Sequence, residues 1–445
     1  MMLRTGRMRA MAVLLAVLGL VAAACSNSTG EDTGGGGGGD QAVSSAPGVT
    51  DSEIRFSVLG TNTNNPLGNC LLDCYAAGVK AYFDYRNSEG GVQGRKLVIA
   101  EEIDDALGEN QKKALQIISA DDTFATLSAP QLAAGWPDLA KAGVPLYGWA
   151  IHPAEMNGQE GIFGNAAAPC LDCPDRTFPY VAKLAGATKI AALGYGITAN
   201  SKMCANQITS TIDKYKADTG QEVVYSNDSL AFGLPNGIGP EVTAMKDAGV
   251  QLIISCLDLN AMKTLAQELK RQGLDGLPMY HLNSYNQEVV AGAEGLFDGD
   301  YMSVIFRPFE ASDGDTAMAK FKEWIAKGDG EPNELAMYGW INADLAYQGI
   351  LKAGPGFTRQ SVIAATNTLT DYSADGLIWP VDWSRQHETP TVQDPVTHGY
   401  KQECRALVKA NGGAFELVGG TKDKPFVCWP AENAKWTEPV LTSFK

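Results

Sequence analysis

The sequence predicts an α/β protein built from two Rossmann-like lobes. Short apolar runs that suit buried strands alternate with segments in which apolar residues recur at helical spacing. The alternation occurs in two separate series, one before and one after about residue 165. Strands that alternate with helices form parallel sheets, because each helix carries the chain back to the start of the next strand. Two series therefore indicate two sheets rather than one.

The first strand–helix–strand unit carries the clearest signals. The run 54–60 is apolar and ends in glycine, which is typical of a buried strand. The polar loop 61–68 follows, and apolar residues then recur at helical spacing over 71–83. Gly90 and Gly91 end this helix, since glycine tolerates the left-handed backbone of a C-cap. The apolar run 97–100 is the next strand.

The later elements follow from the same signals. In the helix 110–119, Leu115 and Ile118 are expected to face inward. At 128–130, Ser-Ala-Pro places proline directly after a serine cap, which predicts a helix start. Its expected apolar residues are Leu132, Trp136 and Leu139. Further strands are expected at 124–127, 144–149, 189–194, 222–226, 250–255, 277–280 and 302–307, and helices at 178–185, 205–214, 240–248, 259–272, 316–325, 339–352 and 358–368. The tail 398–429 is expected to form strands joined by a glycine turn.

The first residues indicate export. Three arginines among the first nine residues precede the apolar stretch 11–24, which has the length of a signal peptide core and is too short to span a bilayer. The stretch ends VAAAC, as in a lipoprotein signal whose Cys25 is lipidated; the alternative is an ordinary secretory signal with Cys25 incidental. We therefore assign 1–24 to a lipoprotein signal peptide. The Gly/Ser-rich segment 25–50, with six consecutive glycines, is a flexible tether.

Cysteine usage agrees with export. Nine cysteines are present, and eight remain if Cys25 is lipidated, an even number that suits disulfides in an oxidising compartment. An i, i+4 disulfide fits a regular helix poorly, so the loop should extend past Cys74 if Cys70 and Cys74 pair. The alternative is a four-thiolate metal site formed by CLLDC and CLDC. The predicted pairs are Cys70–Cys74, Cys170–Cys173, Cys204–Cys256 and Cys404–Cys428.

Charge and motifs exclude several function classes. The formal net charge of −16 argues against nucleic acid or an anionic membrane surface as a partner. No GxGxxG motif follows any of the predicted strands, and the chain contains no Walker-A, GxSxG or HExxH motif. The pair Asp104 and Asp105 is expected to cap the next helix or bond nearby backbone rather than act as a catalytic pair. The sequence thus predicts no catalysis, no cofactor and no metal site. The four histidines, none at metal-ligand spacing, are His152, His281, His387 and His398.

The turn 90–97, GGVQGRKL, and the acidic pair after the following strand carry a resemblance to a family. They resemble the opening of the extracytoplasmic solute-binding proteins of the branched-chain amino acid (leucine/isoleucine/valine-binding) ABC-transporter family. The resemblance extends over 51–429 and implies the periplasmic binding protein type I fold, with two lobes joined by a three-segment hinge. The segment 376–383 resembles the third crossing. By this resemblance lobe 1 is 51–164 plus 304–376, and lobe 2 is 165–303 plus 377–435.

Ligands of open α/β sheets bind outside the carboxyl ends of the strands. Ser128, at a predicted helix start, would offer its hydroxyl and free amides to a ligand carboxylate; the alternative is a plain N-cap. The resemblance implies the same role for Ser128, with neighbours from the next strand end. The candidate ligand-binding residues are Thr61, Asn64, Ser128, Ala129, Trp149, Ala150, Ile151, Tyr195, Asp258, Asn283, Tyr285 and Tyr338.

Two positions depart from the family pattern and bear on the ligand. In the family, a residue with a hydroxyl group that helps to hold the ligand carboxylate is expected at the position where this chain has Ile151 or His152. Its acid, which would take a ligand ammonium, is expected where this chain has Asn283 or Ser284. A buried ammonium without a carboxylate is costly, so either Asp258 supplies the charge or the ligand lacks an α-amine. An apolar wall is expected from Trp149, Tyr195, Tyr285, Tyr338 and Trp340.

These observations predict a monomeric, lipid-anchored solute-binding protein on the outer face of the cytoplasmic membrane. It would capture an amino acid, or a related carboxylate or amide, by hinge closure and deliver it to an ABC permease. The membrane would be touched only through the lipid anchor. The alternatives are a ligand-sensing ectodomain that partners a signalling protein, a binder of a larger apolar organic acid, and an exported enzyme, which the missing motifs disfavour.

Overall fold

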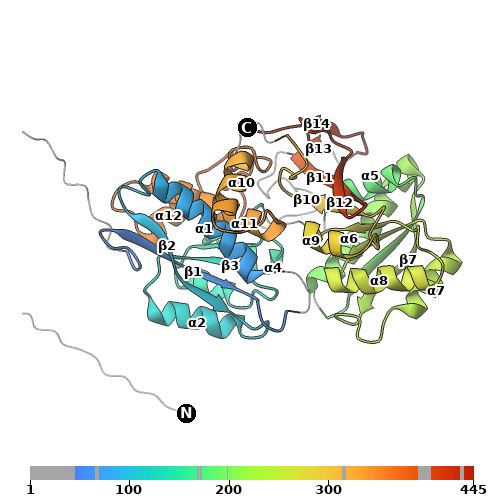
Figure 1. Cartoon of the computed structure of the whole chain (residues 1–445), viewed down its shortest axis with the longest axis horizontal. Helices are drawn as coiled ribbons and strands as arrows, with labels where there is room; N and C mark the ends of the chain where they lie inside the picture. Colours follow the sequence, from blue (N-terminus) through green and yellow to red (C-terminus); the bar gives the residue numbers. More distant parts are fainter. Residues whose placement is uncertain are drawn as a thin grey trace, which may run out of the picture. The chain divides into compact units, whose positions relative to one another are not determined.

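The structure is a computed structural model that describes residues 46–65, 70–167, 170, 173–197, 199–312, 317–388, 402–430 and 435–445 (Figure 1). The predicted signal peptide, Cys25, most of the tether and His398 lie outside the described residues. Two separate sheets are present: all strand pairs of the first are parallel, and the second joins parallel strands to an antiparallel edge. This confirms the α/β class and the two series predicted from the alternation of strands and helices.

The first sheet has five parallel strands in the order β2-β1-β3-β4-β5. They are β1 (Glu53–Gly60), β2 (Lys96–Asp104), β3 (Ala125–Ala129), β4 (Leu146–Gly148) and β5 (Ile162–Gly164). The helices among these strands are α1 (Leu72–Ser88), α2 (Asn110–Ala120), α3 (Trp136–Lys141) and α4 (Pro153–Met156). Three later helices belong to the same lobe, namely α10 (Ala317–Lys327), α11 (Glu334–Ala353) and α12 (Arg359–Thr366).

Helix α11 lies directly against α1 (Figure 1). Two glycines make this close crossing possible. A Cβ at Gly339 would lie 2.1 Å from the carbonyl oxygen of Tyr75, and one at Gly78 would lie 1.8 Å from that of Ala336. Any side chain at either position would therefore push the helices apart. The crossing fixes the N-terminal half of α11, which carries Tyr338, on the first lobe.

The second sheet has the order β14-β13-β11-β10-β9-β8-β6-β7, and β12 pairs with β11. Strands β7, β6, β8, β9 and β10 are parallel neighbours, whereas β11 to β14 add an antiparallel edge. The strands are β6 (Lys189–Tyr195), β7 (Glu222–Leu230), β8 (Leu252–Cys256), β9 (Met279–His281), β10 (Tyr301–Val304), β11 (Gln402–Asn411), β12 (Ala414–Val418), β13 (Phe426–Pro430) and β14 (Val440–Thr442). The helices are α5 (Thr177–Leu184), α6 (Ala199–Thr219), α7 (Gly239–Ala248), α8 (Leu259–Arg271) and α9 (Gln287–Gly292).

The chain passes between the two lobes three times. The crossings lie between β5 and α5, between β10 and α10, and between α12 and β11. Each lobe thus contains segments that are distant in sequence, so a relative motion of the lobes would be absorbed in the three connecting segments.

Two local predictions were wrong. The chain does not start a helix at Ser128, because β3 continues through Ala129 and pairs Leu59 with Ser128. Helix α3 begins only at Trp136, and Leu132 lies before it and is exposed. Leu115, predicted to face inward on α2, is 50% exposed, while the neighbouring positions Ala114 and Ile117 are buried. In both cases a local pattern was outweighed by pairing and packing with distant residues.

The structure joins the same four cysteine pairs that the sequence analysis proposed. Their Cα–Cα distances are 5.6, 5.3, 6.1 and 4.2 Å in chain order. The loop does not extend past Cys74 as predicted: α1 begins at Leu72, so Cys74 lies in its first turn and Cys70 lies before the helix. The alternative four-thiolate site is not formed, because each short pair is closed within its own loop. The described residues contain no group of three or more His, Cys, Asp or Glu that could hold a metal ion.

Within the described part of the chain, no helix has both the length and the apolar character needed to cross a membrane.

Candidate functional site

The loops at the carboxyl ends of six parallel strands, three in each sheet, form the candidate site. Polar groups at such ends converge because parallel strands finish at one edge of their sheet. We call these segments the strand-end loops. They are 61–65 after β1, 130–135 after β3, 149–152 after β4, 196–197 after β6, 257–258 after β8 and 282–286 after β9.

Thr61 joins two of these loops. Its buried hydroxyl donates to Asp105 Oδ1 at 2.8 Å and accepts from the amide of Gln131 at 2.9 Å. Asp105 also accepts from the amide of Leu107 and the side chain of Asn110. The predicted local bonding of this acid is therefore confirmed, and Thr61 acts as a tie between the loops after β1 and β3.

Asp104 is bound just as fully. It accepts from the amides of Asn62, Thr63 and Ala106 and from the Thr63 hydroxyl. Burial alone would raise the pKa of Asp104, but these hydrogen bonds lower it to about 2. The side chain of Asn64, a predicted ligand residue, is exposed and donates to the carbonyl of Ala106 at 3.4 Å.

Ser128 does not form the predicted anion site. Its side chain is fully buried within β3, where the hydroxyl donates to Leu59 O at 2.9 Å and accepts from Trp136 Nε1 at 2.9 Å. Neither a helix cap nor a free hydroxyl is present, so both interpretations of Ser128 were wrong. Ala129 is also buried, and its carbonyl accepts from the amide of Thr61 at 3.4 Å.

The backbone amides of the loop after β4 already have hydrogen-bond acceptors within the protein. The amides of Trp149 and Ile151 donate to Ser128 O and Trp149 O, and the amide of Ala150 donates to Asn165 Oδ1 at 2.8 Å. The three backbone donors expected to face a carboxylate are therefore already engaged. The carbonyl of Ile151 accepts from Asn200 Nδ2 at 3.2 Å, which connects this loop to the first turn of α6 in the second lobe.

His152 follows in the same loop and is buried. Its Nε2 lies 3.0 Å from Pro130 O, so it joins the loops after β4 and β3. Burial lowers the pKa of His152 to about 4, and the hydrogen bond to Pro130 opposes the shift only in part. The imidazole is therefore neutral at neutral pH and contributes no charge to the site.

In the second lobe, Asp258 is committed to the protein. It is the N-cap of α8, where Oδ1 accepts from the amide of Ala261 at 3.0 Å, and Oδ2 accepts from the Tyr195 hydroxyl. Burial and the neighbouring Asp258 carboxylate raise the pKa of Tyr195, so the phenol stays protonated and keeps donating. The sequence proposed Asp258 as a partner for a ligand ammonium, but both oxygens already have partners.

An aromatic and acidic cluster links the loop after β9 to α11. Tyr285 donates to Glu310 Oε2 at 2.6 Å, and Tyr338 donates to Glu334 Oε1 at 2.5 Å. Burial raises the pKa of Glu334 to about 7, against the opposing hydrogen bonds from Tyr338 and from the backbone amide of Tyr285. The Tyr338 ring lies 6.4 Å from that of Trp149 in a stacked orientation. The cluster therefore brings together Trp149, Tyr285 and Tyr338, three of the five residues predicted to form an apolar wall. Of the other two, Tyr195 packs on Phe232, and Trp340 packs on Tyr82, Tyr85 and Phe321.

More than ten residues of the described structure carry a buried side-chain polar atom with no hydrogen-bond partner, and three of them lie in or directly after the strand-end loops without having been predicted as ligand residues. They are Gln131 Nε2, Asn200 Oδ1 and Ser284 Oγ. Each belongs to a strand-end loop or to the helix turn directly after one. The predicted residue Asn283, next to Ser284, is instead exposed. The sequence contained the signal of a polar residue just after a strand, but it did not show which polar atom would lack a partner.

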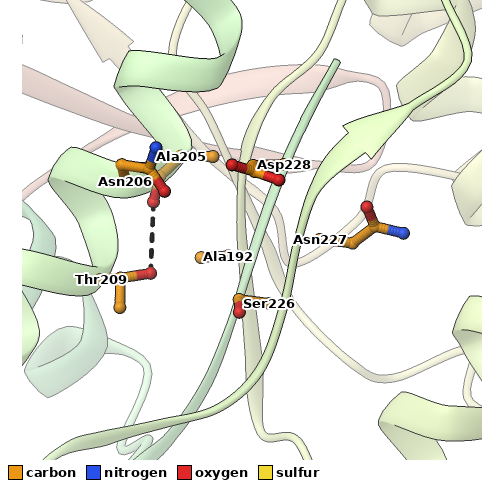
Figure 2. A pocket seen from close by; sticks show the side chains of 7 residues that line it. All are labelled: Ala192, Ala205, Asn206, Thr209, Ser226, Asn227 and Asp228. Carbon is orange, nitrogen blue, oxygen red and sulfur yellow. Dashed lines mark hydrogen bonds between the residues drawn. The ribbon is translucent and has the colours of Figure 1, made fainter. Parts of the chain in front are cut away.

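The larger of two described cavities lies away from these loops. It has a volume of about 270 Å³ and lies between α6 and the edge strand β7 (Figure 2). Asp228 at its rim accepts from the Ser229 hydroxyl and lies 3.8 Å from Lys202 Nζ. A second cavity of about 130 Å³ adjoins α8 and β9. The first is lined by Ala192, Ala205, Asn206, Thr209, Ser226, Asn227 and Asp228, so neither the strand-end loops nor the predicted ligand residues contribute to it.

The strand-end loops, in contrast, are joined to one another. The contacts run from Thr61 to Gln131, from Pro130 to His152 and from Ile151 to Asn200, and a further contact joins Tyr195 to Asp258. The contact between Glu334 and Tyr285 adds the loop after β9. The three loops of the first sheet are thus connected directly, and the loops of the second sheet are connected through Asn200 on α6, Tyr195 at the end of β6 and Glu334 on α11.

Comparisons with known proteins agree with this architecture. Residues 69–420 match the model of a family described as periplasmic binding protein. A fatty acid ABC transporter substrate-binding protein from Thermomonospora curvata is similar in structure, with a TM-score of 0.66 and 17% identity over 90% of this chain and 98% of that chain. The sequence comparison with curated proteins found no match.

Two further solved structures are similar and contain ligands. One is a branched-chain amino acid transporter substrate-binding protein from Streptococcus pneumoniae in complex with isoleucine, with a TM-score of 0.64 and 17% identity over 82% of this chain and 99% of that chain. The other is a solute-binding protein from R. palustris in complex with benzoate, with a TM-score of 0.62 and 16% identity over 83% of this chain and 96% of that chain. At these identities the likeness establishes the fold.

Proposed function

Because the chain belongs to the periplasmic binding protein family, we propose that it captures a small solute between its two lobes and delivers it to an ABC importer. The observation that carries the proposal is the connected group of strand-end loops. Loops at the carboxyl ends of parallel strands are where ligands of such sheets bind. Here the loops of both sheets meet, through Asn200 and Ile151 on one side and Glu334 and Tyr285 on the other.

The three connections between the lobes support capture by hinge closure. A hinge needs a few short segments that absorb the change in backbone angles, and three crossings restrict the motion to opening and closing. The direct contacts between the lobes at Ile151 and Tyr285 would exchange with contacts to the solute. No catalytic step and no cofactor form part of the proposal, and a monomer suffices for it.

The solutes of proteins with similar structures support a small organic solute. Those proteins are described as binders of isoleucine or benzoate, or as part of a fatty acid transporter. An amino acid, or a related carboxylate or amide, therefore remains the proposed class of solute for this chain. A family of extracytoplasmic proteins also agrees with the export signal at the start of the sequence.

The proposal is tested by a thermal-shift screen of the full chain against amino acids, amides, aliphatic and aromatic acids, and sugars. We expect one class to raise the unfolding temperature at micromolar concentration, because a ligand that binds only the folded state stabilises it by mass action. Deletion of the gene should abolish uptake of the same solute by cells. A blank screen together with unchanged uptake of every solute tested would contradict the proposal.

We also propose that the protein is anchored on the outer face of the membrane through lipidated Cys25, with residues 25–50 as the tether. Cys25→Ser should move the protein from the membrane fraction to the soluble fraction while leaving solute binding unchanged. If the variant still fractionates with membrane lipid, the anchor is not at Cys25.

A further inference from the structure

We propose that the solute is a neutral amphipathic amide whose head group is bound by Gln131, Asn200 and Ser284. This inference rests on the proposed solute-binding function and names the substrate class of that same site. It is carried by three observations: unpartnered polar atoms in the strand-end loops, charged groups that are already engaged, and exposed apolar side chains beside the polar ones.

The unpartnered atoms lie at three separate points of the connected loops. The backbone N–H of Gln131 donates to the Thr61 hydroxyl, and Asn200 Nδ2 donates to the carbonyl of Ile151. Ser284 directly precedes Tyr285. Ser284 is only 2% exposed, and its hydroxyl has no partner within the described residues. A buried polar atom without a partner destabilises a protein, so it marks a place where a partner is expected. Opening of the lobes would uncover these atoms to a solute.

The charged groups near these atoms are used internally. Asp258 caps α8 and accepts from Tyr195, Asp105 binds Thr61 and Asn110, and Asp104 binds three amides. The strand-end loops themselves contain neither lysine nor arginine in their sequence. Within the strand-end loops an ammonium would therefore find no free carboxylate, and a carboxylate would find no cation and would face the charge of Asp258. Oε2 of Glu155, which has no partner among the described residues, lies outside these loops, on α4. Burial of a charge without a partner is strongly unfavourable.

Apolar side chains flank the unpartnered atoms. Leu132, directly after Gln131, is 47% exposed. Ile197 and Met203, on either side of Asn200, are 77% and 36% exposed. Each of them lies within three residues of Gln131 or Asn200 in the sequence, and covering its exposed apolar surface would be favourable. A solute with an apolar body would cover them while its head reaches the polar atoms.

The chemistry of the three atoms matches an amide head. Gln131 Nε2 is a donor and needs an acceptor, which an amide carbonyl supplies. Asn200 Oδ1 is an acceptor and needs a donor, which an amide N–H supplies. Ser284 can pair with either group. A carboxylate offers no donor to Asn200, and an ammonium offers no acceptor to Gln131, so each would leave one atom unpaired.

The test compares head groups on a constant apolar body. The full chain is titrated by calorimetry with leucine, 4-methylpentanoate and 4-methylpentanamide, and then with phenylalanine, 3-phenylpropanoate and 3-phenylpropanamide. We expect the amide of at least one series to bind at least about tenfold more tightly than its acid and its amino acid, a difference typical of an unpaired group in a polar site. Equal or tighter binding of an acid or amino acid would overturn the inference.

The design separates this inference from the proposed function. If neither amide binds but another solute of the thermal-shift panel does, the amide class is wrong while solute binding stands. If no solute binds and cellular uptake is unaffected by deletion, both fail.

Two variants test the residues themselves. In Gln131→Met and Ser284→Ala, an unpaired buried atom is removed, so the unfolding temperature without ligand should stay the same or rise. Binding of the preferred amide should nevertheless weaken about tenfold, as expected for loss of one hydrogen bond to a buried group. The matched controls are Gln116→Met and Ser119→Ala on the exposed face of α2. Unchanged affinity in both variants, or a lower unfolding temperature that accounts for weaker binding, would overturn the assignment.

Discussion

Asp104 and Glu334 are two acids at opposite ends of the candidate site, and their environments differ in an instructive way. Asp104 is partly exposed and accepts several hydrogen bonds from the loop after β1, which lower its pKa to about 2. Glu334 is 5% exposed and accepts from Tyr338 and the Tyr285 amide, yet burial raises its pKa to about 7. Hydrogen bonds favour the charged form in both cases, and desolvation opposes it in both. The difference shows that full burial outweighs two donors, whereas partial burial does not outweigh four.

The two acids should also respond to pH in opposite directions. The folded pKa of Glu334 lies above its ordinary value of 4.5, so the folded state binds the extra proton between pH 4.5 and about 7. Its contribution to stability is complete below pH 4.5 and is lost as the pH rises toward 7. The folded pKa of Asp104 lies below its ordinary value of 3.8, so its contribution is present above pH 3.8 and is lost as the pH falls toward 2.

The largest expected effect comes from removing the buried acid. Glu334→Ala would leave the Tyr338 hydroxyl and the Tyr285 amide buried without an acceptor and would create a small void. We expect the free energy of unfolding to fall by about 4 kcal/mol, measured by urea denaturation at pH 5, where the native carboxyl is protonated. Glu331→Ala, at an exposed position shortly before α11, is the matched control and should change stability by less than about 0.5 kcal/mol. A loss below about 1 kcal/mol for Glu334→Ala would show that the cluster is not tightly packed.

The second prediction isolates the charge of Glu334. Glu334→Gln keeps an acceptor but cannot ionise, so its stability should not share the loss between pH 4.5 and 7. The wild-type protein should lose about 3 kcal/mol relative to the variant over this range, since one pKa unit corresponds to about 1.4 kcal/mol. Parallel urea titrations at several pH values measure the difference. A constant difference across the range would mean that Glu334 ionises as an ordinary surface carboxyl.

A smaller effect is expected from Tyr338→Phe. The variant removes the hydroxyl that donates to Glu334 but keeps the ring beside Trp149. Stability should fall by about 1–2 kcal/mol near pH 7, because the carboxylate loses a donor, and by less at pH 5. The mid-point of the pH-dependent loss should shift upward as the pKa of Glu334 rises further. Thermal unfolding at the two pH values provides the measurement, and an unchanged mid-point would contradict the contact.

The smallest effect is expected for Asp104, the more exposed of the two acids. Asp104→Asn should destabilise the protein by less than about 1 kcal/mol at pH 7, because solvent screens a partly exposed carboxylate. The difference between wild type and variant should disappear as the pH falls from 3.8 to 2, since the native carboxyl then becomes neutral. Acid titration followed by circular dichroism tests this. A difference that persists at pH 2 would assign the effect to shape rather than to charge.

The alternation of strands and helices was predictable from the sequence because hydrophobic periodicity is a local property. The helix expected at Ser128 was not correct, because the serine hydroxyl bonds Leu59 and Trp136, contacts that arise only when β3 pairs with β1. The sequence does contain the true start of α11: Asn333 caps the helix by accepting from the amide of Ala336 at 2.9 Å. That cap places Glu334 and Tyr338 in the helix, five residues before the predicted start at 339.

The composition of the candidate site was only partly predictable. Aromatic residues near strand ends and at the hinge were found from their position, and the structure brings Trp149, Tyr285 and Tyr338 together. The state of a polar group depends on its partners, which lie elsewhere in the sequence. Asp258 was predicted to be available to a ligand and is engaged, whereas Asn200 Oδ1 and Ser284 Oγ, which were not predicted to bind a ligand, lack partners within the described residues. Whether each donor and acceptor has a partner can be determined only from the three-dimensional structure.

The backbone contact of α1 and α11 at Gly78 and Gly339 has a mechanical consequence. Helices whose main chains touch cannot slide past one another without a steric clash, so α1 and α11 would move as one rigid unit. Glu334 and Tyr338 belong to α11, and Glu334 contacts the loop that contains Tyr285. If the loop that contains Tyr285 were displaced, the side chains of Glu334 and Tyr338 would therefore have to adjust, because the two helices could not.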